Sequence, residues 1–109
     1  MRVALYARYS SDLQNAASIQ DQLAACRAFV DRMDAQIVAT FEDAAISGAS
    51  LANRPGLQTL MRDAERRRFD VVVCEALDRL SRSQADVATV FEDLRFQGVG
   101  IRTLAEGEV

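Results

Sequence analysis

Two kinds of apolar pattern alternate along the chain. Short, nearly continuous apolar runs are typical of strands covered on both faces, and they occur at 3–7, 37–41 and 71–74, with a weaker alternating run at 99–103. Between these runs, apolar residues recur at steps of three and four, which predicts amphipathic helices. The predicted stripes are Ile19, Leu23, Cys26, Val30 and Met33; Leu57, Leu60, Met61 and Ala64; and Val87, Val90, Phe91 and Leu94.

Helix boundary signals agree with this division. Ser18 followed by Asp21 resembles a capping box and predicts the start of the first helix, while Pro55 suits the first turn of the second. Ser83 is a plausible N-cap of the third helix and Gly98 its terminator. The order β-α-β-α-β-α-β predicts a doubly wound α/β domain: a mainly parallel sheet of four or slightly more strands, with helices on both faces.

Composition narrows the class of protein. The chain has 109 residues, half of them apolar, which suffices for one domain with a core and not for two. Its net charge of −3 excludes a uniformly basic surface, and the absence of histidine excludes Ser-His-Asp hydrolases and histidine-ligated metals. Cys26 and Cys74 are expected to be buried thiols. With no apolar run long enough for a membrane span and none suited to a signal peptide, we expect a cytoplasmic protein without a membrane partner.

Unusual polar segments follow each of the first three predicted strands, at 8–14, 43–55 and 77–82. In an open parallel sheet, ligands bind beyond the carboxyl ends of the strands, so these segments should share one edge. They contain at least four arginines, whose forked donors match phosphate oxygens. A serine among arginines could attack phosphorus, with the guanidinium groups stabilising the added charge.

Other phosphate chemistries fit less well. The sequence has neither a Walker loop nor a G-x-G-x-x-G motif, and it has Arg8 and Ser10 where a phosphotransfer receiver would carry acidic residues. Both cysteines fall in predicted core elements, which disfavours a cysteine-based phosphatase. Acidic residues do not cluster as two-metal catalysis requires. A metal-dependent nuclease is therefore a poor fit.

Four blocks, in order, resemble one family. Tyr6–Gln14 resembles the Y-x-R-x-S-x-x-x-Q opening of the serine recombinases (the resolvase/invertase family), and Asp43–Gly48 resembles their D-x-x-x-S-G segment. Asn53–Leu57 is similar to the R-P-G-L helix start, and Leu77–Arg82 matches L-D-R-L-x-R. The likeness covers nearly the whole chain and implies a resolvase-like catalytic domain. The segment with Gln20, Gln22 and Cys26 looks most similar to the large serine recombinases.

The resemblance implies site-specific DNA recombination through a 5′-phosphoserine intermediate, without metal or cofactor. Ser10 would be the nucleophile, and Asp78 would support the arginines and could donate a proton to the leaving 3′-oxygen. The residues implied to hold or surround the phosphate are Arg8, Arg79, Arg82, Gln22 and Arg54. Gln14 also matches the motif.

The family also implies partners. Its members act on double-stranded DNA at specific sites, as homodimers that pair into tetramers, and they continue into a long dimerisation helix and a DNA-binding region. We therefore expect 1–109 to be a single, truncated catalytic domain, inactive alone. A non-catalytic α/β interaction or regulatory module derived from a recombinase is the alternative, and a phosphohydrolase or metal-dependent nuclease is a third hypothesis.

Several residues have plainer explanations. Tyr6 and Tyr9 are expected to pack rather than react, and Arg66–Arg68 to form a solvated helix end rather than a DNA contact. Asp43 and Ser47 could equally shape their loop through local hydrogen bonds or serve the site.

Overall fold

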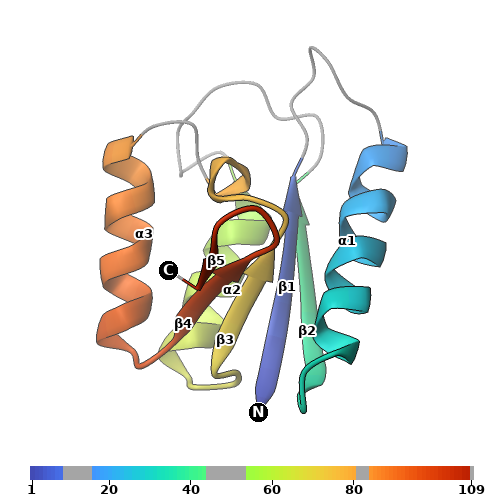
Figure 1. Cartoon of the computed structure of the whole chain (residues 1–109). Coiled ribbons are helices and arrows are strands. Elements are labelled where there is room, and N and C mark those ends of the chain that lie inside the picture. Colours follow the sequence, from blue (N-terminus) through green and yellow to red (C-terminus); the bar gives the residue numbers. More distant parts are fainter. Residues whose placement is uncertain (9–15, 44–53, 81–83, 109) are drawn as a thin grey trace.

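The computed structural model describes residues 1–8, 16–43, 54–80 and 84–108, where strands and helices alternate as predicted (Figure 1). The elements are β1 (Arg2–Arg8), α1 (Ala16–Asp31), β2 (Gln36–Asp43), α2 (Pro55–Glu65), β3 (Val71–Cys74), the 3₁₀ turn η2 (Leu77–Arg79), α3 (Gln84–Phe96), β4 (Gly100–Thr103) and β5 (Gly107–Glu108).

The sheet has the order β2-β1-β3-β4-β5. The β1–β2, β1–β3 and β3–β4 pairs are parallel, while β5 runs antiparallel to β4. The doubly wound α/β prediction is confirmed. The short antiparallel strand β5 was not predicted individually, because two residues are too few to produce an apolar pattern.

Helices cover both faces of the sheet, as Figure 1 shows. α1 packs on one face, where its buried stripe meets alternate residues of β1 and β3 such as Leu5 and Val73. α2 and α3 pack on the other face, around Tyr6, Val72 and Ile101. Each central strand is therefore buried on both sides, which is why its sequence is almost continuously apolar.

Two boundary predictions for the first helix were wrong. α1 begins at Ala16, so Ser18 is its third residue and not its N-cap, because Ala16 and Ala17 favour the helix and extend it. The helix ends at Asp31, so Met33 lies in the turn that follows.

The later helices agree better with the predictions. α2 begins at Pro55. α3 begins at Gln84, although Ser83 itself lies outside the described residues. Gly98 has φ +78° and terminates α3, with the Val99 amide donating to the Leu94 carbonyl. Among the described helices, none is long and apolar enough to cross a membrane.

Candidate functional site

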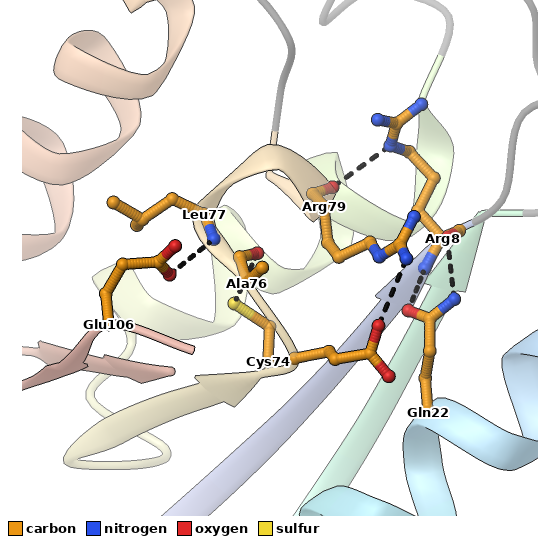
Figure 2. Close-up of polar contacts among 8 residues, drawn as sticks. Arg8, Gln22, Cys74, Ala76, Leu77, Arg79 and Glu106 are labelled. Atoms are coloured by element: carbon orange, nitrogen blue, oxygen red, sulfur yellow. Dashed lines mark hydrogen bonds and ion pairs between the residues drawn. The ribbon is translucent and has the colours of Figure 1, made fainter. Parts of the chain in front are cut away.

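The candidate site lies where the strand order reverses. The chain leaves β1 toward β2 on one side and later returns to place β3 on the other side of β1. In such sheets, the crevice beyond the carboxyl ends of these two strands is where ligands bind. Arg8 ends β1 there and η2 follows β3, so both lie beyond the carboxyl ends of these two strands (Figure 2).

Gln22 from α1 fixes the backbone of Arg8. The Arg8 N–H donates to Gln22 Oε1 at 3.2 Å, and Gln22 Nε2 donates to the Arg8 carbonyl at 2.9 Å. Gln22 is 1% exposed, so this amide pair is shielded from water. A buried polar side chain that satisfies both backbone groups holds the end of β1 at one position relative to α1.

Arg79 is bound through both its backbone and its side chain. Its carbonyl accepts a hydrogen bond from Arg8 Nε at 3.0 Å, and its Nη2 forms an ion pair with Glu75 Oε1 at 3.0 Å (Figure 2). The two guanidinium groups thus come from the end of β1 and from η2, the turn that follows the adjacent strand β3. Two guanidinium groups at the same edge of the sheet form an arrangement suited to an anion such as a phosphate.

Arg54 lies behind η2. Its Nη2 donates to the Arg79 carbonyl at 2.7 Å and to the Tyr6 hydroxyl at 2.6 Å, while Nη1 donates to the Leu80 carbonyl. The guanidinium carbon also lies 5.5 Å from the centre of the Tyr6 ring. Arg54 is 1% exposed, so in this arrangement it holds the backbone of the turn that carries Arg79.

Asp43, at the end of β2, caps a helix that begins 12 residues later. Its Oδ1 accepts from the Gly56 N–H at 2.7 Å, and its Oδ2 accepts from the Leu57 N–H at 2.9 Å. These are amides of the first turn of α2, where a carboxylate is favoured by unpaired N–H groups and the helix dipole. Of the two interpretations of Asp43, the structure shows backbone hydrogen bonding, here to the start of α2; the loop after Asp43 lies outside the described residues.

Tyr6 connects these groups. Its hydroxyl donates to Asp43 Oδ2 at 2.7 Å and accepts from Arg54. Burial raises the pKa of Tyr6 well above its ordinary value of 10.0, so the phenol is neutral under ordinary conditions. Tyr6 packs in the core as predicted, and its hydroxyl joins the end of β1 to the end of β2 and to Arg54.

Several predicted site residues cannot be placed. Ser10, Gln14, Ser47 and Arg82 lie outside the described residues. The backbone of Asp78 belongs to η2, but its side chain is not described. The structure therefore brings together Arg8, Gln22, Arg54 and Arg79, and the roles of the others stay predictions.

Glu75 was missed by the sequence analysis. The only signal was its spacing four residues before Arg79, which suits an ion pair within one helical turn. No group of three or more His, Cys, Asp or Glu residues within the described part of the chain could hold a metal ion. Cys26 and Cys74 are buried free thiols, as predicted.

Comparison with known proteins identifies the family. The family model described as "Resolvase, N terminal domain" matches residues 3–109. The chain belongs to this family. Its fold is similar to the N-terminal catalytic domain of TP901-1 integrase, with a TM-score of 0.87 and 33% identity over 98% of this chain and 79% of that one. It is also similar to the C-terminal catalytic domain of ISC1926 TnpA, an IS607-like serine recombinase, with a TM-score of 0.85 and 29% identity over 95% of this chain and 70% of that one.

A longer relative matches most of this chain. The chain is 30% identical, over 99 residues, to a Bacillus subtilis (strain 168) protein named as a candidate DNA recombinase. The match covers 89% of this chain and 19% of the relative, so the chain spans about a fifth of that protein's length.

Proposed function

We propose that this resolvase N-terminal domain is the catalytic domain of a site-specific serine recombinase, which breaks and rejoins DNA through a 5′-phosphoserine link. The observation that carries the proposal is the meeting of Arg8 and Arg79 beyond the carboxyl ends of β1 and β3, where Arg8 Nε binds the Arg79 carbonyl at 3.0 Å. Ser10, the proposed nucleophile, follows Arg8 by two residues in the sequence.

The proposed reaction conserves phosphodiester bonds. Ser10 Oγ loses its proton and attacks the scissile phosphorus, which forms the O–P bond to serine. The bond from phosphorus to the 3′-oxygen breaks, and that oxygen takes up a proton and leaves as a hydroxyl. Since one phosphodiester replaces another, a 3′-hydroxyl can later attack the phosphoserine and reseal DNA without a cofactor. Arg8, Arg79 and Arg82 would stabilise the charge that builds on the phosphate.

Gln22 and Arg54 would position the arginines that bind the phosphate. The amide group of Gln22 already binds both backbone groups of Arg8. The Nη atoms of Arg54 already bind Tyr6 and the carbonyls of Arg79 and Leu80, and only its Nε has no acceptor among the residues that the structure describes. We therefore propose that both residues position the arginines, and that a direct phosphate contact by Arg54 would use Nε. Asp78 keeps its proposed role of orienting arginines or protonating the leaving oxygen.

The proposed partner is double-stranded DNA at specific recombination sites. The net charge of −3 does not favour strong binding of DNA by this segment, so affinity would come from other parts of a longer cytoplasmic protein. In that protein the domain would act in homodimers that pair into tetramers.

A covalent-adduct assay tests the proposal. The protein at its natural length is incubated, in EDTA, with DNA carrying its recombination site and a nick near the crossover point. We expect a protease-sensitive adduct at the 5′ end, lost in Ser10→Ala and retained in the matched control Ser11→Ala. An adduct that survives Ser10→Ala would contradict the nucleophile, and binding without any adduct would favour a non-catalytic module.

A further inference from the structure

The turn after β4 packs against the segment that carries Arg79. Thr103 ends β4 opposite Cys74. Beyond this pair, the Leu104 N–H donates to the Cys74 carbonyl at 3.2 Å, and the Ala105 N–H donates to the Glu75 carbonyl at 3.0 Å. The contact between β3 and β4 therefore continues past the end of both strands, into the residues that lead to η2.

Glu106 completes this contact with a single carboxylate oxygen. Its Oε1 accepts from the Leu77 N–H at 3.1 Å (Figure 2). The same oxygen accepts from the Thr103 hydroxyl at 2.7 Å. The Glu106 N–H donates in turn to Thr103 Oγ1 at 2.8 Å. Thr103 is fully buried, so the oxygen of Glu106 is anchored to the core of the sheet at the point where it meets η2.

Leu77 is the first residue of η2, and amides at the start of a helical turn have no partner within it. The residue before the turn, Ala76, supplies no side-chain cap. Glu106 fills this role from 29 residues further along the chain. At the other end of the same turn, Arg8 and Arg54 bind the Arg79 carbonyl. The turn is thus held at its first amide and at its last carbonyl.

We infer that Glu106 is a positioning residue of the site: its carboxylate oxygen binds the first amide of η2 and so sets where the Arg79 side chain meets a DNA phosphate. The inference rests on the proposed function, which places Arg79 on the phosphate. The sequence analysis attached no role to Glu106, because its partners Leu77 and Thr103 come together only through the pairing of β3 with β4.

Two substitutions distinguish the effect of the hydrogen-bonding oxygen of Glu106 from the effect of its negative charge. Glu106→Gln keeps one carbonyl oxygen, which can accept both hydrogen bonds, whereas Glu106→Ala removes it. Glu92→Ala, at an exposed position on α3, is the matched control. In the 109-residue chain, we expect the Leu77 amide to exchange with solvent about tenfold faster in Glu106→Ala, and near the wild-type rate in Glu106→Gln and Glu92→Ala. Unchanged Leu77 exchange in Glu106→Ala would overturn the inference.

The same variants are then tested in the protein of natural length. In single-turnover adduct formation on nicked DNA, we expect Glu106→Ala to slow the covalent step roughly ten- to hundredfold with DNA affinity unchanged, since small displacements of a positioned group carry such losses. Glu106→Gln should restore most of the rate. A merely structural role would instead reduce thermal stability and DNA binding together.

The failure of this inference and the failure of the proposed function are distinguishable. If Glu106→Ala forms the adduct at the wild-type rate while Ser10→Ala forms none, Glu106 is not a positioning residue and the proposed function stands. If adduct formation survives Ser10→Ala, the proposed function fails and the role of Glu106 fails with it.

Discussion

Gly56 should be the glycine least tolerant of a side chain among those that the structure describes. A Cβ placed there would lie 2.2 Å from the carbonyl oxygen and 2.8 Å from the carbonyl carbon of Glu42, and 3.0 Å from Asp43 Oδ1. Cβ atoms essentially never lie closer than 3.0 Å to a non-bonded heavy atom, so α2 and the end of β2 would have to separate by about 0.8 Å. Because the closest atoms belong to the backbone, no rotation of a side chain relieves the clash.

The cost of Gly56→Ala follows from three contributions. Overpacking costs about 1–3 kcal/mol. Weakening the two hydrogen bonds from the Gly56 and Leu57 amides to the Asp43 carboxylate costs about 1.5–3 kcal/mol. The higher helix propensity of alanine returns about 1 kcal/mol. We expect a net loss of about 1.5–5 kcal/mol in the free energy of unfolding, or about 7–22 °C in Tm.

Urea unfolding followed by circular dichroism measures this loss. Gly100→Ala is the matched control, because its Cβ would lie 3.8 Å from Val71 Cγ2, an ordinary contact, and should change stability by less than about 0.5 kcal/mol. If Gly56→Ala unfolds at the same urea concentration as Gly100→Ala, the close approach of α2 to β2 is not as described. Arg54 stands two residues before Gly56, so the same substitution should also disturb the hydrogen bonds that hold η2.

Three further predictions follow from individual side chains. Arg67 has φ 54° just after α2, so Arg67→Gly should stabilise the fold by about 0.5–1 kcal/mol in the same unfolding assay, whereas Arg66→Gly, at φ −86°, should not; equal effects would contradict the left-handed conformation. The raised pKa of Tyr6 means that the folded state retains a proton that the unfolded state releases, so stability should fall as pH rises above 10.0, and Tyr6→Phe should reduce that dependence to the part that the raised pKa of Cys26 contributes; a variant with the full wild-type dependence would refute the assignment. Burial raises the pKa of Cys26 to about 11 and Cys74 is also buried, so neither thiol should react with a disulfide reagent at neutral pH until the protein is denatured; rapid labelling of native protein would show that they are accessible.

The strands and helices were predictable because their signals are local. Val71–Cys74 is apolar at every position because both faces of β3 are covered, and its predicted bounds are those observed. Pro55 and Gly98 mark helix ends through their own backbone preferences. Ser18 misled because a capping pattern of four residues was weighed without the helix-forming alanines before it. The recombinase motifs likewise lie within contiguous segments, so the family was recognisable without a structure.

The contacts between those segments were decided only by the tertiary structure. Asp43, the last residue of β2, accepts a hydrogen bond from an amide in the first turn of α2. Glu106, in the turn after β4, binds the first amide of η2. Arg54 matches a phosphate-site motif in sequence, yet its guanidinium binds the Tyr6 hydroxyl and the carbonyls of Arg79 and Leu80. Sequence patterns report which residues repeat along one helix or strand. The partner of a buried polar group depends instead on how the strand ends and helix starts align in space, which is fixed by the packing of the whole sheet.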